Sequence, residues 1–459
     1  MSDSRSGAWR CMVCGYIHRQ SAAPDECPIC GAAKSYFEAM ATEAPIKAEF
    51  DARTANFSGN LVVLGAGIAG ISAVEAFRKA TSGGTVTLIT KESSLPYYRL
   101  NLTRYLAGEI GNDELPIHDR AWYDSNNVDL KLGEEVADIS LGDRRVIMRD
   151  GSGMPFDRLI ITIGAHPFVP PLAGAHREGV TALRTLHDAR LMLKQLRPGM
   201  TCAVVGGGIL GLEAAGALAA RGAGVSVIEG GEWLMPRQLN KRAGEILLKH
   251  VNGLGIKVVS NARTKELIGD ERVMGVLMED GRQIPADLVV VATGVRPNSQ
   301  LARRAGLAVK TGVIVDNHLR SSHPSVYAAG DVAEHMGVLY GNWTACQYQG
   351  GIAGINAAGG DAEFGGIPRS NSLKVLGLEL SSIGKFEPDG PECMVLESES
   401  DGEYIRFVFK DRQMIGAVLI GDAAVSLAAK DAIEGRKDFS GVLAKDASAA
   451  QVAEGLRTT

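Results

Sequence analysis

Leu61-Val-Val-Leu-Gly-Ala-Gly-Ile-Ala-Gly70 is the stretch of this sequence that decides its fold. Four apolar residues enter a Gly-x-Gly-x-x-Gly motif and an alanine-rich stretch leaves it, which predicts a buried parallel strand, a tight turn and a helix. Gly65 permits the turn, Gly67 lets a pyrophosphate approach the backbone, and Gly70 lets helix and strand pack closely. The free N–H groups of the helix N-terminus favour a diphosphate, so the stretch predicts a dinucleotide site.

A second copy of this pattern lies at Thr201-Cys-Ala-Val-Val-Gly206-Gly-Gly208-Ile-Leu-Gly211-Leu-Glu213. Its next strand, 224–229, ends in Glu229, where an acid would bond a ribose 2′-hydroxyl and repel a 2′-phosphate. No arginine follows directly, because the next two residues are glycines. The second copy therefore favours NADH over NADPH, and two copies in one chain predict two dinucleotides.

The ribose partner of the first site is less direct. The strand predicted at 85–90 ends in Thr90, where the acid is expected, and Glu92 follows two residues later. We therefore expect Glu92 to be the ribose-binding acid.

Composition limits the class of protein. The 459 residues suffice for about three domains, 45% are apolar, and the net charge is −5, so nothing indicates a nucleic-acid partner. No apolar run reaches the roughly 18 residues that span a bilayer, and residues 1–7 lack an apolar signal core. We expect a cytoplasmic protein without a membrane partner. Disulfides are rare in that compartment, so the seven cysteines are candidates for metal binding or catalysis.

Four cysteines near the N-terminus form two Cys-x-x-Cys pairs with twelve residues between them. These are Cys11, Cys14, Cys27 and Cys30. Such pairs predict two knuckles that hold one tetrahedral metal, and four thiolates suit iron or zinc. A domain of this size needs the metal in order to fold.

The stretch from about residue 8 to residue 38 resembles the short rubredoxin-like domain of rubrerythrins. The resemblance rests on Cys-x-x-Cys-Gly-Tyr followed by Cys-Pro-x-Cys-Gly. It implies an iron centre that carries electrons. A zinc ribbon uses the same ligand spacing and would be structural, so both metals stay open at this point.

Two further patterns tie the dinucleotide halves together. Segments 157–167 and 287–297 are parallel in sequence, each a buried strand that runs into a glycine turn, and Tyr327-Ala-Ala-Gly-Asp331 follows later. Residues 60–459 resemble the FAD-dependent pyridine nucleotide oxidoreductases, the glutathione-reductase-like superfamily. The resemblance implies that the first glycine motif binds FAD, that the second binds NAD(P)H, and that Asp331 bonds the FAD ribityl chain.

The expected fold class is α/β, with an NAD domain inserted in an FAD domain, a small rubredoxin-like metal domain before them and an α+β domain after them. The expected units are a metal domain at 1–40, a linker at 41–58, the FAD domain at 59–170 and 296–363, the NAD domain at 171–295 and the C-terminal domain at 364–459.

The cysteines help to place the chain within the superfamily. No redox cysteine pair follows the first glycine motif, and Cys202, Cys346 and Cys393 are interpreted as packed small residues. Reaction through a protein sulfur is therefore not expected.

The segment 95–104 resembles the Pro-Tyr-x-Arg-Pro-x-Leu-Ser-Lys motif of rubredoxin reductases, ferredoxin reductases and the flavoprotein part of nitrite reductase. The match implies that Arg99 contacts FAD. It also implies that Arg104, in place of the lysine, lies near the isoalloxazine and pairs with Glu213. Leu100 departs from the motif, which has proline at that position.

The segment 341–350 resembles the Glu-Thr-Trp…Gln-x-Gln-Gly run of the same reductases, which places Trp343 beside the flavin. The residues expected to bind the two cofactors follow from these matches and from the glycine motifs. They are Gly65, Ala66, Gly67, Ile68, Ala69, Gly70, Glu92, Arg99, Val136, Gly164, Gly330 and Asp331 for FAD, and Gly206, Gly208, Gly211, Glu229 and Gly294 for NADH.

These predictions define one function and two alternatives. NADH gives two electrons and a thiolate iron centre takes one, and a flavin can do both. We expect electrons to pass from NADH through FAD to the iron and on to a redox protein such as a rubrerythrin-like or flavo-diiron protein. Alternatively, the module is a zinc docking piece and the acceptor is an external ferredoxin, rubredoxin or nitrite reductase subunit. A third hypothesis is an NADH-sensing flavoprotein. The sequence predicts no oligomeric state.

Overall fold

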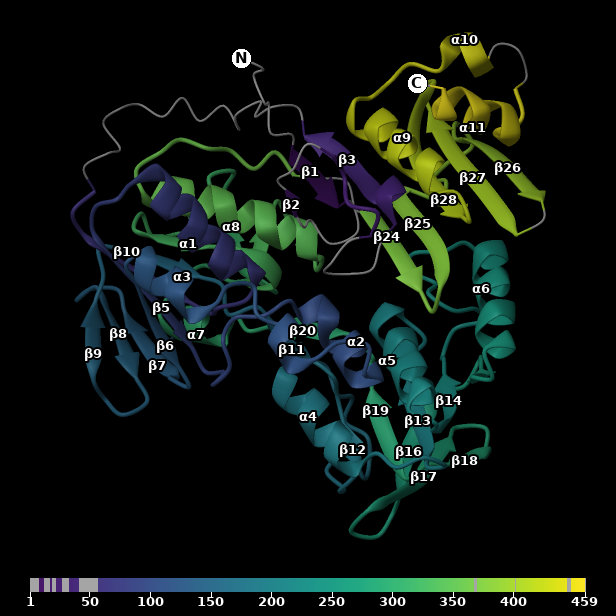
Figure 1. The fold of residues 1–459 in the computed structure, drawn as a ribbon, viewed down its shortest axis with the longest axis horizontal. Helices are drawn as coiled ribbons and strands as arrows, with labels where there is room; N and C mark the ends of the chain where they lie inside the picture. The colour runs from purple at the N-terminus through teal and green to yellow at the C-terminus, as the bar shows by residue number, and fades with distance from the viewer. Residues whose placement is uncertain are drawn as a thin grey trace.

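A computed structural model of the chain describes residues 8–11, 17–18, 22–26, 33–40, 57–366, 370–400, 402–443 and 447–458 (Figure 1). All structural statements below concern these residues. The model confirms the predicted α/β fold class with two dinucleotide-binding units. The limits predicted for the individual domains stay predictions.

The first unit is a five-stranded parallel sheet that contains the opening stretch. Its strand order is β22-β10-β4-β5-β6, so the fourth strand in sequence, β10, lies beside the first, β4. The strands are β22 (Val326–Ala328), β10 (Arg158–Ile161), β4 (Asn60–Leu64), β5 (Thr85–Thr90) and β6 (Val128–Leu132). Strand β4 is buried apart from its first residue, as its apolar run predicts.

The second unit repeats this arrangement. Its parallel sheet has the order β12-β19-β13-β14-β15 and is covered by α4 (Leu186–Gln195), α5 (Ile209–Ala220) and α6 (Lys241–Gly253). The strands are β12 (Val180–Thr181), β19 (Leu288–Val291), β13 (Thr201–Val205), β14 (Gly224–Ile228) and β15 (Lys257–Val259).

Short strands and helices connect the two units and flank them. Where the chain crosses between them, β11 (Ala165–Pro167) pairs with β20 (Val295–Pro297) in antiparallel orientation. The ends of the two similar segments, 157–167 and 287–297, therefore lie side by side. The remaining strands are β7 (Val136–Ser140), β8 (Arg145–Met148), β9 (Gly153–Pro155), β16 (Thr264–Gly269), β17 (Val273–Met278), β18 (Gln283–Pro285), β21 (Val313–Val315) and β23 (Ala333–His335). The short helices are η3 (Arg99–Asn101), α2 (Leu102–Ala107), η4 (Asn112–Glu114), α3 (Arg120–Ser125), α7 (Gln300–Arg304) and η5 (Gly330–Val332).

The C-terminal unit is an antiparallel sheet with the order β24-β25-β28-β27-β26. One face of the sheet shares a core with the second dinucleotide unit, and the other face packs on α9 (Ala423–Glu434) and α11 (Ala449–Arg457). The other elements are β24 (Ser370–Val375), β25 (Leu378–Gly384), β26 (Met394–Ser400), β27 (Glu403–Lys410), β28 (Gln413–Ile420) and α10 (Ser440–Leu443).

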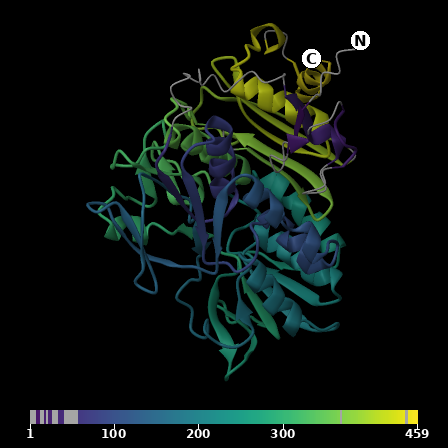
Figure 2. The ribbon, with the colours of Figure 1, turned by 60° about the vertical axis from the view of Figure 1, so that its left-hand side comes forward.

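The described part of the N-terminal unit is a small sheet with the order β2-β1-β3 and a one-turn helix, η1 (Lys34–Tyr36), which directly precedes β3 in the chain. Its strands are β1 (Ala8–Cys11), β2 (Ile17–His18) and β3 (Phe37–Met40). Figure 2 shows this sheet next to α9 of the C-terminal unit, and η1 contacts α9. Cys14, Cys27 and Cys30 lie outside the described residues, and of Cys11 only the backbone is described.

Among the residues that the structure describes, no helix is long and apolar enough to cross a membrane.

Two glycines bring the backbones of α1 (Ile68–Ala80) and α8 (Trp343–Ala357) into contact. A Cβ atom at Gly350 would lie 2.2 Å from the carbonyl oxygen of Ala69, and one at Gly354 would lie 2.1 Å from that of Ala73. These distances are too short for any side chain, so the two helices can approach this closely only through glycine. The contact fixes α8, and with it Trp343, against the helix that starts at the first glycine motif.

Replacing Gly354 with Ala should lower the free energy of unfolding by roughly 1–3 kcal/mol, because the new methyl group must push the helices apart. Gly351 is the matched control. It lies on the same helix, a Cβ there would meet nothing within 4 Å, and Gly351→Ala should stabilise the protein by roughly 0.5–1 kcal/mol. Thermal unfolding of the two variants measures both effects. Equal melting temperatures would contradict the close helix contact.

Candidate functional site: two glycine turns and a flavin-side cluster

The first glycine turn is closed by contacts between backbones. Gly65 has a φ of +100°, and a Cβ on it would lie 2.4 Å from the carbonyl oxygen of Thr162 on the neighbouring strand. A Cβ on Gly70 would lie 2.0 Å from the carbonyl oxygen of Gly65. Positive φ and this crowding both exclude a side chain. Ala69 is buried where α1 meets α8, and Ala66 and Ile68 are half-buried.

The second glycine turn repeats this geometry. Gly206 has a φ of +116°, a Cβ on it would lie 2.5 Å from the carbonyl oxygen of Ala292, and one on Gly211 would lie 2.0 Å from that of Gly206. Two carboxylates, one in each unit, make the same link from the start of a neighbouring strand, β10 or β19, to the start of the strand that enters the glycine turn, β4 or β13. Asp157 accepts from the amide of Asn60 at 2.7 Å, and Asp287 accepts from the amide of Thr201 at 2.8 Å.

Each turn leads to a helix N-terminus that no side chain caps. Gly67 is the N-cap of α1 and Gly208 is the N-cap of α5, and a Cβ at either would meet nothing within 4 Å among the described residues. The first N–H groups of both helices therefore face open space beside a turn that only glycine can form. These two cradles fit the diphosphates of two dinucleotides.

The acid expected for the first ribose lies in a network of polar side chains. Glu92 forms an ion pair with Arg99, and Tyr97 donates to Glu92 with its hydroxyl at 2.7 Å. Arg99 also donates to the carbonyl oxygen of Arg184 at 2.7 Å. The amide of Glu92 donates to the hydroxyl of Thr90 at 3.3 Å, so the threonine at the end of β5 fixes the backbone that carries the acid. The structure thus places Glu92 and Arg99 together, and their contact with FAD stays a prediction.

Asp331, the residue expected to bind the ribityl chain, lies in η5 and forms an ion pair with Arg184 at 2.7 Å. Sequence reasoning missed Arg184. A capping box follows it, in which the side chain of Thr185 accepts from the amide of Asp188, and this marks the start of α4 but does not indicate the pair with Asp331. Arg184 thus links the segments of both residues expected to contact FAD, Asp331 by its side chain and Arg99 by its carbonyl.

A buried side chain near Asp331 also fits a bound cofactor. The side chain of Gln349, which is buried, accepts from the amide of Gly330 at 2.8 Å, and its Nε2 has no hydrogen-bond partner among the described residues. A buried amide donor without a partner favours a ligand acceptor at this place. Together with the open cradle at Gly67, it shows that these residues fit FAD.

Glu229 lies over the second glycine turn, where the ribose is expected. Its carboxylate accepts from the amide of Gly207 at 2.8 Å and from the amide of Gly231 at 2.6 Å. Sequence analysis missed Arg263, whose Cγ lies 3.9 Å from the Cβ position of Gly230. No local motif could have found it, because α6 and β15 lie between the two residues in sequence.

The residues expected beside the flavin, together with their direct contacts, form the flavin-side cluster. They are Tyr98, Thr103, Arg104, Glu213 and Trp343. Trp343 begins α8 and stacks on Tyr98 with 5.7 Å between the ring centroids, and the N-cap Asn342 accepts from the amide of Ala345 at 2.8 Å. Val136, expected to bind FAD, lies at the start of β7, and Gly164 and Gly294 occupy the two crossing turns with φ of +63° and +112°.

Glu213 of α5 lies opposite α2, the helix that carries Arg104. Thr103 donates to the carboxylate of Glu213 at 3.3 Å, and Arg104 donates to Glu109 at 3.2 Å. The expected pair of Arg104 with Glu213 stays a prediction, and the neighbouring threonine supplies the hydrogen bond that the structure shows. Burial raises the pKa of the Glu213 carboxyl to about 7, and the Thr103 hydroxyl opposes this rise.

The three free cysteines that the structure describes differ in burial. Cys202 and Cys346 are buried, as expected of packed small residues. Burial raises the pKa of Cys202 to about 11, and burial together with the nearby Asp331 raises that of Cys346 well above its usual value. The packed interpretation was wrong for Cys393, which is half-buried in a surface loop and donates to Asp389 at 3.2 Å.

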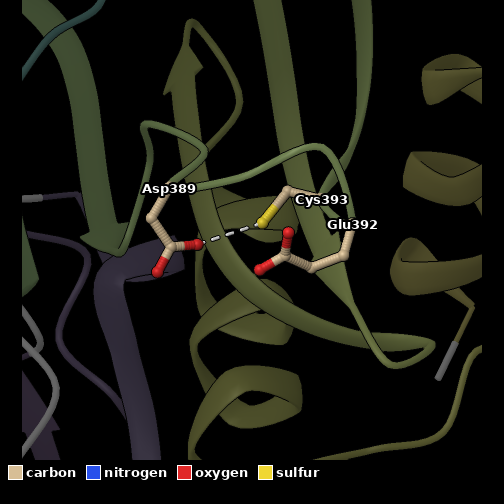
Figure 3. A group of neighbouring side chains, drawn as sticks. All are labelled: Asp389, Glu392 and Cys393. Carbon is tan, nitrogen blue, oxygen red and sulfur yellow. Dashed lines mark hydrogen bonds between the residues drawn. The ribbon is translucent and has the colours of Figure 1, made fainter.

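Figure 3 shows this loop, in which Asp389, Glu392 and Cys393 point toward one another. The two carboxylates already have cationic partners. Lys410 lies 2.7 Å from Glu392, and Lys385 pairs with Asp389. The group is therefore an ion-pair cluster at the surface and gives no reason to infer a metal site.

Comparison with known proteins identifies the class to which this fold and these sites belong. The model of the pyridine nucleotide-disulphide oxidoreductase family matches residues 59–358. The rubrerythrin rubredoxin-like domain matches residues 9–38, and the C-terminal domain of rubredoxin NAD+ reductase matches residues 370–437. The chain belongs to the pyridine nucleotide-disulphide oxidoreductase family and is an FAD-dependent oxidoreductase whose dinucleotides are FAD and NAD(H).

Several characterised proteins are similar to this chain. The NADH-rubredoxin oxidoreductase of Clostridium acetobutylicum is 31% identical over 392 residues, which cover 85% of this chain and 98% of that protein. The crystal structure of NADH:rubredoxin oxidoreductase from the same organism superimposes with a TM-score of 0.74 at 30% identity, over 87% of this chain and 100% of that one. Nitrite reductase [NAD(P)H] of Bacillus subtilis is 36% identical over 79% of this chain and 46% of that protein. An assimilatory nitrate reductase electron transfer subunit of B. subtilis is 31% identical, and the chain spans about half the length of both B. subtilis relatives.

The raised pKa of Glu213 predicts a pH dependence of stability. In the unfolded chain the carboxyl titrates near its ordinary value of 4.5, whereas in the folded chain it titrates near 7. Between these values only the unfolded state loses the proton, so the stability contributed by this group falls as pH rises through this window and levels off above it.

Replacing Glu213 with Gln should remove this loss. The stability of Glu213→Gln relative to the native protein should increase from about pH 5 to about pH 8, as measured by thermal unfolding. Thr103→Val should shift the window to higher pH, because the Thr103 hydroxyl lowers the pKa of Glu213. Parallel pH curves for native protein and Glu213→Gln would contradict a raised pKa at this residue.

Proposed function

We propose that this protein passes electrons from NADH, by way of FAD, to an iron centre held by Cys11, Cys14, Cys27 and Cys30, and from there to a redox protein. In this proposal it is an NADH:rubredoxin-type oxidoreductase with its one-electron carrier in the same chain. The terminal acceptor is proposed to be a rubrerythrin-like or flavo-diiron protein. The similarity to the C. acetobutylicum NADH-rubredoxin oxidoreductase over nearly its whole length supports this assignment.

One observation carries the proposal: the described cysteines of the family domain offer no reactive sulfur. Residues 59–358 contain only Cys202 and Cys346. Both are buried, both are free, and burial raises the pKa of both, so neither supplies a thiolate near neutral pH. Electrons that enter from NADH therefore need another acceptor, and the four-cysteine module is the one this chain carries.

FAD, when bound, accepts a hydride from NADH and releases electrons one at a time. The protein contributes binding and orientation. The cradles at Gly67 and Gly208 would hold the two diphosphates, and Asp331, fixed by Arg184, would hold the ribityl chain. Tyr98 and Trp343 form an aromatic wall on the proposed flavin side, and the pair of Thr103 and Glu213 provides a carboxyl group that can hold or release a proton near pH 7.

A second candidate follows from the B. subtilis nitrite reductase and nitrate reductase subunit. Here the chain reduces an external ferredoxin, rubredoxin or nitrite reductase partner, and the N-terminal module holds zinc as a docking piece. The two candidates share the NADH and FAD sites and differ in the metal and in the role of the module. A third candidate, a flavoprotein that senses NADH, requires flavin reduction slower than the usual turnover range of about 1–1,000 per second.

The metal decides between the first two candidates. Protein purified anaerobically with ample iron should contain one iron per chain, and NADH should bleach both the flavin and the iron absorption bands. Metal analysis and an anaerobic NADH titration measure this. Stoichiometric zinc alone would contradict the proposed function and support the second candidate.

Substitution of one metal ligand separates the two roles of the module. Cys11→Ser should abolish the iron band and lower the reduction of an added rubredoxin, while flavin reduction by NADH continues at the native rate. Cys393→Ser, at a half-buried cysteine outside the module, is the control and should change neither. If Cys11→Ser reduces added rubredoxin as fast as the native protein, the module is not on the electron path.

The carboxylate of Glu229 should set the preference for NADH. Glu229→Gln removes the negative charge and should lower the ratio of kcat/KM for NADH to that for NADPH by at least about tenfold, since like charges placed together are strongly unfavourable. Arg263 lies beside the same turn, with its Cγ 3.9 Å from the Cβ position of Gly230. The control is Glu245→Gln, at an exposed glutamate of α6 that pairs with Arg242. An unchanged coenzyme ratio in Glu229→Gln would show that the preference lies elsewhere.

A further inference from the structure

The N-terminal module has a buried tyrosine whose polar partners belong to another domain. Tyr36, at the end of η1, is 2% exposed, and its hydroxyl hydrogen-bonds the carboxylate of Glu379 on β25 of the C-terminal unit. Burial, and then the charges of Glu379 and Asp422, raise the pKa of Tyr36. The phenol therefore stays a neutral donor and lies between two carboxylates of the C-terminal unit.

Other contacts support the same interface. η1 packs on α9, and Phe37, the residue after Tyr36, is also buried. On α9 the residues facing the sheet core include Val425 and Ala429, whereas Lys430 lies on the flank of the helix and is still only 8% exposed. A lysine is rarely buried on an uncovered helix flank, so this side of α9 is a covered surface.

The partners of Tyr36 are themselves held in place. Asp422 caps α9 by accepting from the amide of Val425 at 3.0 Å, and it also accepts from Nε of Arg457 on α11 at 3.0 Å. Glu379 lies directly after the turn between β24 and β25, where the amide of Gly421 donates to its carbonyl at 3.0 Å. Asp422 and Glu379 are thus held by contacts within the C-terminal unit.

This surface is joined rigidly to the flavin side. Leu376, in the turn just before Glu379, contacts α5, where a Cβ at Gly216 would lie 1.9 Å from the Leu376 side chain. His250 of α6 also bonds the carbonyl oxygen of Leu376 at 2.9 Å. α5 is the helix that carries Glu213. The turn between β24 and β25 therefore connects the surface that contacts Tyr36 to the flavin-side cluster.

We propose that the C-terminal domain is the docking surface for the chain's own four-cysteine module, with Tyr36 as the anchor between Glu379 and Asp422, and that the module accepts electrons while it is docked there. Electron acceptance in the docked state rests on the proposed function, whereas docking on the C-terminal domain does not. Tyr36 is a positioning residue, because it acts through the place at which it holds the module.

Two single-atom changes test the anchor in the full-length protein. Tyr36→Phe removes the donor and Glu379→Gln removes the charge of the acceptor. Each should increase amide hydrogen exchange in residues 33–40 by about tenfold, the size expected when a buried hydrogen bond to a charged group is lost. Tyr404→Phe is the matched control. Tyr404 is as buried as Tyr36 and lies in the sheet that carries Glu379, in the core shared with the NAD unit. Its hydroxyl donates to Glu397 at 2.9 Å. It should leave exchange in residues 33–40 unchanged.

Stopped-flow mixing with NADH tests electron acceptance in the docked state. In Tyr36→Phe, reduction of the metal centre should slow several-fold relative to flavin reduction, which should keep its native rate. Unchanged exchange in both Tyr36→Phe and Glu379→Gln would overturn the anchor. Faster exchange with an unchanged or faster reduction of the metal would overturn docking as the electron-accepting state. If the native protein holds only zinc, the electron-transfer half fails with the proposed function, and the exchange data still decide the docking.

Discussion

The structure depends on one constraint, the contact of a glycine α-carbon with a carbonyl oxygen where a side chain would not fit. In the first unit Gly65 lies against Thr162 and Gly70 lies against Gly65, at 2.4 Å and 2.0 Å for the missing Cβ atoms. These contacts hold the strand, the turn and the helix close together, and at the helix N-terminus a Cβ on Gly67 would meet nothing within 4 Å among the described residues. The same constraint recurs between α1 and α8 and brings Trp343 to that site.

The same constraint recurs in the second dinucleotide unit. The second turn, at Gly206 and Gly211, has nearly the same geometry, and Asp157 and Asp287 make equivalent links in the two units. The crossing strands β11 and β20 then pair with each other. One architecture is thus used twice, and the two sites differ in the polar residues beside the turn, Glu229 in one and the Arg184–Asp331 pair in the other.

The parts of the fold that were predictable from sequence are those set by neighbours in the chain. Strand β5 occupies Thr85–Thr90 as predicted, and both glycine turns lie where their spacing placed them, because the close contacts of Gly70 with Gly65 and of Gly211 with Gly206 act within five residues. The missed contacts join distant segments. Arg184 reaches Asp331 across 147 residues, and Thr103 reaches Glu213 across 110, so no local pattern announces either. Cys393 was misjudged because its loop exposes it, and loop exposure leaves no periodicity in the sequence.

A carrier fused to its reductase must bind tightly enough to be close and weakly enough to leave for its own acceptor. Fusion supplies the first condition, since a tethered module is at high effective concentration and needs little intrinsic affinity. In the described part of the interface, the hydrogen bond of Tyr36 to a carboxylate contributes roughly 1.5–3 kcal/mol. A larger apolar interface would hold the module permanently and would hide its metal from a partner. A hydrogen bond of this size, added to the tether, agrees with the proposed docking of the module through Tyr36.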